Sequence, residues 1–494
     1  MGAAAPGAER GGRHRLSAPD VVVIGSGPNG LAAAVKLAQG GARVLVLEGH
    51  AEAGGGTRTA ELTLPGFHHD VCSAVHPMGI LSPYFRTLPL EQHGLRWLHG
   101  SSSVAHPLDE GPAVLLMRSA EETAAQLGAD GVAYLGLVRP FLRDPPALIE
   151  DALAPLRFPL HPLLLARFGL AAIRSAAGLA SRFGDVRARA LVAGCAGHAI
   201  LPLDAAATGG LALIFLIAGH VAEWPVAQGG SQAIARALVS LLESLGGRVE
   251  CGVRVRSLSD LPHARLYLFD TSPRQLEMIA GAVLPARYRE RLRAFRYGPG
   301  AFKIDLALSG PIPWRDPRCR TASTVHLGGT FEAIAAAEAE VARGEHPERP
   351  YVLLAQQSEI DPTRAPAGRH TCWAYCHVPA GSTHDQTEAI ERQIERFAPG
   401  FRDLILERHT TAPADWELYN PNYVGGAITG GSADWAQLFT RPVARLNPYT
   451  TPNPRIMICS ASTPPGGGVH GMCGAFAAET ALKRLDRYPI AAPT

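Results

Sequence analysis

The stretch from Asp20 to Thr59 reads DVVVIGSGPNGLAAAVKLAQGGARVLVLEGHAEAGGGTRT, and it decides the fold. Residues 21–24 form a short, apolar, β-branched run that is typical of a buried parallel strand. Glycines follow this run in the spacing G-x-G-x-x-G, at Gly25, Gly27 and Gly30. They permit a tight turn, close approach of a pyrophosphate, and close packing of the Ala-rich helix predicted over 31–39. The N-terminus of that helix offers free N–H groups and a positive dipole end to an anion.

A second strand is predicted over 43–47, and it ends at Glu48. A carboxylate at this place can accept the hydroxyl groups of an adenosine ribose, and it would repel the 2′-phosphate of NADP. FAD and NAD both remain open at this point. The order strand, glycines, helix, strand and acid predicts a dinucleotide-binding, Rossmann-like unit of an α/β fold.

A second glycine cluster, GGGTRT, follows the acid at residues 54–59. NAD does not need such a cluster, whereas it suits a cofactor that continues past the pyrophosphate, with Arg58 as a fixed cation. The segments GSGPNGLAAA, GGGTRT and GFHHDVCSAVHP resemble the phytoene desaturase-like FAD-dependent oxidoreductases, which share their fold with amine oxidases. The resemblance covers nearly the whole chain and is strongest at its two ends.

The resemblance implies a third cofactor element near the C-terminus. A strand over 454–459 leads into a Gly-rich turn and a helix predicted over 475–484, and in the family this segment runs beside the ribityl chain and flavin ring. Cys459, Ser460 and Ala461 stand where the family commonly has a glycine and then a small or acidic residue, so we expect no carboxylate contact to the ribityl. The predicted residues for non-covalent FAD are Gly25, Gly27, Pro28, Asn29, Gly30, Glu48, Gly55, Gly56, Thr57, Arg58, Val255, Ser462, Gly467, Gly468, Val469 and Met472.

The predicted fold class is α/β, with a Rossmann-like FAD-binding domain and a discontinuous α+β substrate domain that combines a mostly antiparallel sheet with a helical cap. We expect residues 1–17 to be a disordered tail. The FAD-binding domain is predicted to comprise 18–97, 226–294 and 441–494, and the substrate domain 98–225 and 295–440.

Composition excludes several classes of function. The formal net charge is only +2 and no basic block with interleaved aromatics occurs, which argues against nucleic-acid binding. The eight cysteines form no C-x-x-C pair, so we expect reduced thiols, no metal site and a cytoplasmic protein. Arginine greatly outnumbers lysine, and alanine, glycine and proline abound, which favours a bacterial origin.

The apolar segment 140–183 is predicted to be helical, with arginines at one flank of its apolar face. It is either a helical cap that packs on its own core, or a surface that dips into a bilayer to fetch a lipophilic substrate. No uncharged apolar run is long enough for a membrane span.

A flavin carries the hydride chemistry itself, and the protein positions the substrate and tunes the ring. Two accessory groups are predicted as catalytic, Lys303 and His470. Lys303 either faces the flavin or forms an exposed ion pair with Asp305, two residues away in a predicted strand. His470, among the glycines of the third element, either touches the pyrimidine edge of the flavin or is a turn residue.

The sequence therefore predicts an FAD-dependent oxidoreductase that moves a hydride from an apolar small molecule to flavin N5. Oxygen, a quinone or a carrier protein would take the electrons. Two alternatives remain: a redox-neutral isomerase or saturase of a polyene-like substrate, and a lipid-binding chaperone of the GDP-dissociation-inhibitor type.

Overall fold

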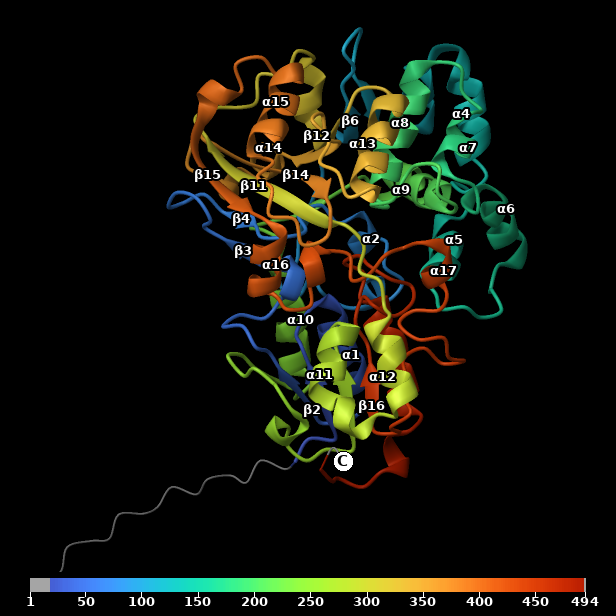
Figure 1. Ribbon diagram of the computed structural model, residues 1–494, viewed down its shortest axis with the longest axis vertical. Helices are drawn as coiled ribbons and strands as arrows, with labels where there is room; N and C mark the ends of the chain where they lie inside the picture. The colour runs from blue at the N-terminus through green and yellow to red at the C-terminus, as the bar shows by residue number, and fades with distance from the viewer. Residues whose placement is uncertain (1–17, 493–494) are drawn as a thin grey trace, which may run out of the picture.

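The structure, a computed structural model, describes residues 18–492, so the tail predicted for 1–17 lies outside the described residues. Two sheets organise the molecule, one in each half, as Figure 1 shows. The lower half holds the chain start together with segments from the middle and end of the sequence. The predicted fold class, a Rossmann-like domain joined to a mostly antiparallel α+β part, is confirmed.

The lower sheet has five parallel strands in the order β16-β10-β1-β2-β9. Its strands are β1 (Val21–Ile24), β2 (Val44–Leu47), β9 (Arg248–Glu250), β10 (Leu266–Phe269) and β16 (Ile456–Ile458). Ile24 at the end of β1 is paired with Leu47 and Phe269, the last residues of its two neighbours. The next residue of each strand therefore meets the others at one edge, which brings together Gly25, Glu48 and Asp270.

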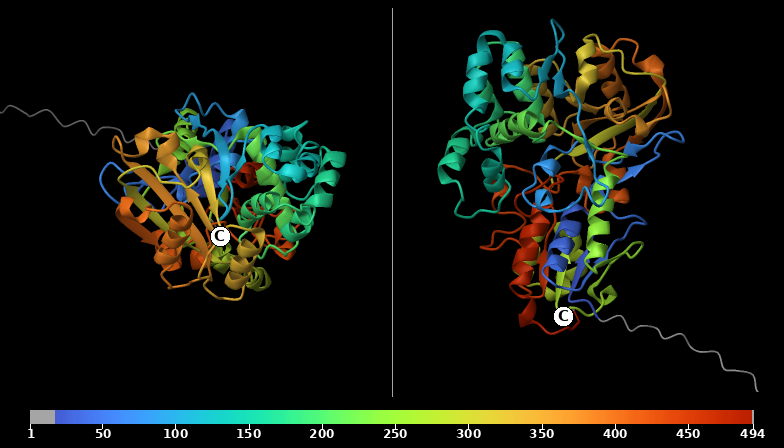
Figure 2. Two further views of the ribbon diagram at one scale, coloured as in Figure 1. Left: turned by 90° about the horizontal axis from the view of Figure 1, so that it is seen from above. Right: turned by 180° about the vertical axis from the view of Figure 1, so that it is seen from behind.

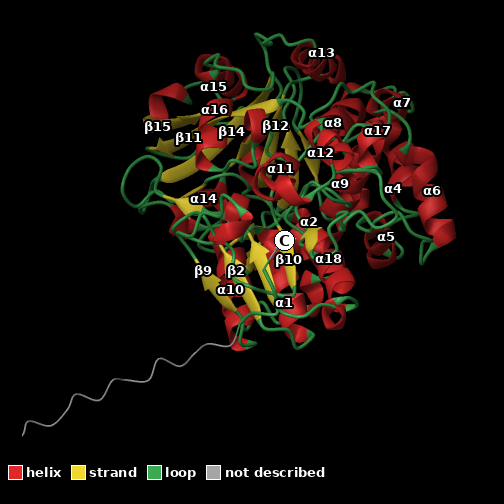
Figure 3. Cartoon of the chain, turned by 60° about the horizontal axis from the view of Figure 1, so that its bottom comes forward, coloured by secondary structure: helices red, strands yellow, loops and turns green. Residues whose placement is uncertain are grey.

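Helices cover both faces of this sheet, and Figure 3 shows three of them, α1, α10 and α18, beside its strands. One face carries α1 (Pro28–Gln39), α10 (Gln232–Ser244) and α18 (Met472–Leu482), and the other carries α11 (Pro273–Ala280) and α12 (Ala286–Arg293). α18 crosses α1 so closely that a Cβ on Gly474 would lie 1.8 Å from the Asn29 carbonyl oxygen. Glycine at this crossing lets the third cofactor element pack against the first.

The upper sheet has seven strands in the order β15-β11-β14-β13-β12-β6-β7, all antiparallel except the parallel pair β6 and β12. Its strands are β6 (Ser102–His106), β7 (Val114–Leu116), β11 (Gly300–Leu308), β12 (Ala322–Leu327), β13 (Val352–Ala355), β14 (His370–Val378) and β15 (Ile405–Thr411). For residues 401–408 the sequence pattern alone predicts a helix, and that prediction is wrong. A single 3-10 turn, Arg402–Leu404, leads into β15, which pairs with the edge of β11.

The two faces of the upper sheet differ in what covers them. α15 (Thr387–Phe397) packs on one face through Ile390, Ile394 and Phe397. The other face meets a helical group that Figure 2 shows beside the sheet, made of α8 (Val186–Gly197), α9 (Thr208–Ala222) and α13 (Phe331–Ala342).

The segment predicted to be helical over 140–183 contains α5 (Pro145–Ala152), α6 (Pro162–Ala172) and α7 (Ala176–Ala180). Among residues 18–492, no helix combines the length and the apolar character that crossing a membrane requires.

Candidate functional site

A cavity of about 770 Å³ begins at the edge where Gly25, Glu48 and Asp270 meet and extends to the upper sheet. Thirteen of the predicted cofactor residues line it, namely Gly25, Gly27, Pro28, Asn29, Glu48, Gly55, Gly56, Arg58, Val255, Ser462, Gly467, Gly468 and Val469. Gly30, Thr57 and Met472 do not line it. They lie behind its wall, where Gly30 packs on Asp270, Thr57 donates to the Gly54 carbonyl, and Met472 starts α18.

The glycine turn leaves no room for side chains. Gly25 has φ +100°, and a Cβ there would lie 2.7 Å from the Asp270 carbonyl oxygen. A Cβ on Gly30 would lie 2.3 Å from the Gly25 carbonyl oxygen, and one on Gly55 would lie 2.9 Å from the Cα of Gly27. The first two glycine clusters therefore contact each other and form one wall of the cavity.

Glu48 is buried, with 9% of its surface exposed, and it is held by three other residues. One oxygen accepts from the N–H of Ser26 at 3.0 Å, and the other accepts from the N–H of His50 at 2.8 Å and from Arg58 Nη2 at 3.1 Å. Arg58 also donates to the hydroxyl group of Tyr419 at 3.2 Å. The sequence predicted Arg58 as a cation for the cofactor, and in this structure it is first an ion-pair partner of Glu48.

Asp270 is a cavity residue that sequence reasoning missed. Its Oδ2 accepts from the N–H of Gly30 at 2.9 Å, at the N-terminus of α1. Burial raises the pKa of Asp270 to about 7 and the charge of Glu48 adds to the rise, while the N–H groups of Gly30 and Gly27 oppose it. The available signal was an acid at the end of a predicted strand that shares a sheet with the glycine turn.

Arg441 is a second missed residue, and it is a buried cation, only 2% exposed, in the cavity wall. Its guanidinium donates to the carbonyl oxygens of Gly430 at 3.2 Å, Ala461 at 3.1 Å and Ser462 at 3.4 Å. Within residues 18–492 it forms no ion pair with a carboxylate. Burial lowers the pKa of Arg441 to about 10, so the group still carries its charge at neutral pH.

The C-terminal element reaches the cavity through its glycines. A Cβ on Gly467 would lie 2.3 Å from the Thr429 carbonyl oxygen, so only glycine fits against that loop. His470 does not line the cavity, is 1% exposed, and accepts from the N–H of Met472 at 3.1 Å. Burial lowers the pKa of His470 to about 4, so its ring is neutral at pH 7. These contacts are those of a residue that shapes the turn.

Lys303 also lies outside the cavity wall. Its Nζ bonds Asp305 Oδ2 at 2.5 Å and the Asp70 carbonyl oxygen at 3.0 Å, and its side chain is 2% exposed. The predicted pairing with Asp305 is present, but the prediction that such a pair would be exposed is wrong. Trp373 lies beside the ammonium, with 5.9 Å from Nζ to the ring centre, and does line the cavity.

The far end of the cavity is apolar and aromatic. Its lining residues are His198, Ile200, Leu211, Phe215, Trp224, Leu353, Trp373 and Tyr375. Trp373 and Tyr375 point to the same side of β14, because side chains alternate along a strand. Among the described residues, the only carboxylates in the cavity lining are Glu48 and Asp270, both at the opposite end. The sequence could not indicate this chamber, because its aromatic residues come from two distant segments, 198–224 and 373–375.

His198 adds a polar ring to the aromatic end. Its Nε2 lies 3.0 Å from Nε2 of His326, and its ring lies 4.7 Å from Phe215 and 5.3 Å from Trp224 between ring centres. Burial lowers the pKa of His198 to about 3 and that of His326 well below its usual value. Both rings are therefore neutral at pH 7, and the chamber carries no charge there.

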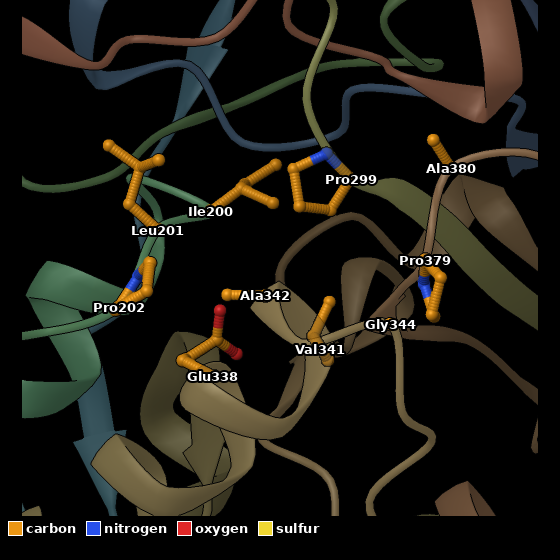
Figure 4. A pocket seen from close by; sticks show the side chains of 10 residues that line it. All are labelled: Ile200, Leu201, Pro202, Pro299, Glu338, Val341, Ala342, Gly344, Pro379 and Ala380. Carbon is orange, nitrogen blue, oxygen red and sulfur yellow. The ribbon is translucent and has the colours of Figure 1, made fainter.

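A smaller pocket of about 360 Å³ adjoins the chamber, since Ile200 lines both. Figure 4 shows the Glu338 carboxylate directed into this pocket, among apolar residues such as Val341 and Pro379. Glu338 accepts from Nδ1 of His377 at 2.8 Å. No group of His, Cys, Asp or Glu side chains in the described part of the chain is arranged to hold a metal ion.

Comparisons with known proteins found similarities in sequence and in fold. Residues 23–88 match the NAD(P)-binding Rossmann-like domain. The chain is similar to a protein named pyridine nucleotide-disulfide oxidoreductase domain-containing protein 2 from Rattus norvegicus, at 26% identity, with 94% of each chain covered. It is also similar to one of the polypeptides of limonene dehydrogenase from Castellaniella defragrans, at 33% identity, but over only 22% of this chain and 19% of that protein.

Solved structures show the fold. An oxidoreductase from Methanosarcina mazei superposes with a TM-score of 0.65 at 16% identity, over 94% of this chain and 99% of that one. Putrescine oxidase bound to putrescine gives 0.59 at 16% identity, and cyclohexylamine oxidase from Brevibacterium oxydans gives 0.56 at 15%, each over 95% of this chain and 99% of the other. The chain has the fold of the amine-oxidase-like flavoprotein oxidoreductases.

Proposed function

We propose that this chain is an FAD-dependent oxidoreductase of the phytoene dehydrogenase-like type, which removes a hydride from an apolar small molecule. One observation carries the proposal: a single cavity joins the dinucleotide-type turn at Gly25 to an uncharged aromatic chamber around Trp373. A dehydrogenase that uses a flavin needs this arrangement, because the reacting carbon of the substrate must meet the cofactor in a site that excludes water.

The residues present fit FAD. Glu48 would hold the ribose hydroxyls, and the N-terminus of α1 together with Arg441 would face the pyrophosphate. Arg441 supports this because it is a buried cation without a carboxylate partner in the described chain, and such a charge is costly unless an anion meets it.

When bound, FAD accepts the hydride at N5. The chain contributes position and environment. Trp373, Phe215 and Tyr375 give flat apolar surfaces that orient a hydrocarbon, and the neutral His198 adds a polar atom without a charge. Limonene dehydrogenase, to which one of the similar proteins belongs, is named for an apolar hydrocarbon, which agrees with this lining.

Amine oxidation is a second candidate, favoured by the two amine oxidases among the similar structures. The lining of the chamber argues against a cationic amine as substrate, because no carboxylate of the described chain lines the aromatic end. An isomerase or saturase would use the same cavity, with no net loss of hydrogen from the substrate.

The test is anaerobic reduction of the bound flavin. The purified protein should be yellow and release FAD on acid precipitation, and a terpene or polyene should bleach it while amines do not. Mass analysis of the product separates loss of two hydrogens from isomerisation without mass change. A colourless protein that FAD cannot reconstitute would overturn the proposal and favour the lipid-binding chaperone. If the flavin is reduced by a substrate, oxygen, a quinone and a carrier protein are compared next as electron acceptors for the reduced enzyme.

A further inference from the structure

A cluster of large apolar side chains is exposed on the outer side of the helical half. The loop before α6 exposes Leu156 at 80% and Phe158 at 86%, and Leu163 in the first turn of α6 is 87% exposed. The cluster, here called the α6 surface, consists of Leu156, Phe158, Leu160, Leu163, Leu170 and Ile173. Figures 1 and 3 both place α6 at the outer edge of the molecule. Exposed apolar side chains gathered in this way mark an interaction site.

The charges around the α6 surface have one sign. Residues 152–184 contain no aspartate or glutamate. The arginines in this segment are all exposed, and within residues 18–492 none forms an ion pair with a carboxylate; they are Arg157, Arg167, Arg174 and Arg182. The carboxylates at the two borders are engaged elsewhere: Asp151 accepts from the N–H groups of Leu160 and His161, and Asp185 pairs with Arg187.

The geometry of α6 separates the apolar and cationic groups. At about 100° per residue, Leu163 and Leu170 share one arc of α6, and Arg167 lies along one edge of that arc. Ile173 and Arg174 follow directly after the end of the helix. The opposite side of α6 packs on α9, where a Cβ on Gly210 would lie 2.9 Å from the Ala172 side chain. Leu211 of α9 lines the cavity, so α9 lies between α6 and the aromatic chamber.

We propose that the α6 surface binds an anionic lipid bilayer, with the apolar side chains in the interface and the arginines among the headgroups. Two contributions hold an interfacial helix on a membrane. One is the burial of apolar side chains at the headgroup level, and the other is the attraction between arginines and anionic lipids. A second copy of the chain is a poorer occupant, because a symmetric dimer would bring the same arginines face to face. The proposal does not rest on the oxidoreductase function.

The test uses the full-length protein and co-sedimentation with vesicles of phosphatidylcholine, alone or with added phosphatidylglycerol. We expect binding to the anionic vesicles that weakens with salt. The substitutions Arg167→Gln and Arg174→Gln together should lower partitioning about 10- to 30-fold, since each basic residue near an anionic surface contributes roughly five-fold. Phe158→Ser with Leu163→Ser should abolish it.

Met278→Ser, at an apolar residue exposed on α11, is the matched control and should bind as the wild type does. Circular dichroism and flavin content measured on every variant separate a folding defect from lost binding. Equal sedimentation with both vesicle types and with all variants would overturn the proposal. A dimer in gel filtration that Phe158→Ser with Leu163→Ser converts to monomer, with no vesicle binding, would assign the surface to a second copy instead.

Discussion

Asp270 places an ionisable carboxyl at the N-terminus of α1, where the pyrophosphate of a dinucleotide would approach. Its pKa is raised to about 7 from 3.8, chiefly by burial and then by the charge of Glu48. Asp270→Asn keeps the shape and an oxygen for the N–H of Gly30, and it removes the charge. The prediction concerns the stability of the protein without cofactor, and then cofactor retention.

The sign follows from proton binding. Between pH 4 and pH 7 the unfolded chain has lost the Asp270 proton while the folded protein keeps it, so the free energy of unfolding falls as the pH rises. At 1.36 kcal/mol per pH unit, the difference between 3.8 and about 7 corresponds to ~4 kcal/mol, complete above pH 7. In Asp270→Asn the side chain carries no titratable proton, so its free energy of unfolding does not fall in this way. It should therefore match the wild type near pH 4 and exceed it increasingly up to pH 8.

The assay is thermal unfolding of the cofactor-free protein from pH 4 to pH 8. With an unfolding entropy of about 2.1 cal/mol/K per residue over 494 residues, ~4 kcal/mol corresponds to a gain in Tm of ~4 °C at pH 8. Asp486→Asn, at an exposed carboxylate, is the control and should follow the wild type. The FAD dissociation constant should rise with pH in the wild type and less in Asp270→Asn. Parallel Tm curves for Asp270→Asn and wild type would refute the reasoning.

Three further variants test the site. Glu48→Ala should weaken FAD binding at least ten-fold, because charge-assisted hydrogen bonds contribute about 1.5–3 kcal/mol each. Flavin absorbance after dialysis measures the FAD that remains bound, with Glu52→Ala at an exposed carboxylate as the control, and equal FAD loading of the two variants would contradict the placement of the ribose at Glu48. Arg441→Met should lose FAD while keeping its circular dichroism spectrum, and Arg441→Lys should recover part of the loading; full loading of Arg441→Met would remove the guanidinium from the pyrophosphate site. Lys303→Met should lower Tm strongly, since an unpaired buried carboxylate costs about 3–5 kcal/mol, and adding Asp305→Leu should restore Tm. The rate of flavin reduction in that double variant, measured by stopped flow, shows whether the ammonium has a kinetic role.

The parts of the fold that the sequence predicted are those whose signals lie close together in the chain. Strand β1, its glycines, α1 and β2 follow one another within 30 residues, so local pattern and the dinucleotide motif coincide. Residues 401–408 show the opposite case. Most of β15 is exposed on both faces, so no alternation marks it, and its extended backbone is held by pairing with β11, about 100 residues earlier. A local pattern cannot contain that information.

The same distinction separates the site residues. Gly25 and Glu48 could be found because one motif relates them. Asp270 and Arg441 come from segments without a motif, and they reach the cavity only through the parallel pairing of β1 with β10 and the loop beside β16. The aromatic chamber has the same origin, since α9 and β14 meet only in the folded chain. Aromatic residues make up only 6% of the chain, yet folding brings several of them together at one end of the cavity.

Lys303 shows what strand alternation can and cannot tell. It predicted that Lys303 and Asp305 share a face, and they do, but alternation does not say what covers that face. The His69–Asp70 strand β4 lies over it, so Lys303 donates to the Asp70 carbonyl oxygen instead of to water. Trp373 therefore stands as the cavity residue beside the ammonium, 5.9 Å from Nζ to the ring centre. The ammonium of Lys303 lies behind that indole ring, which makes Lys303 a candidate positioning residue for Trp373. Because Lys303 pairs with Asp305, its removal must be tested with Asp305 neutralised as well.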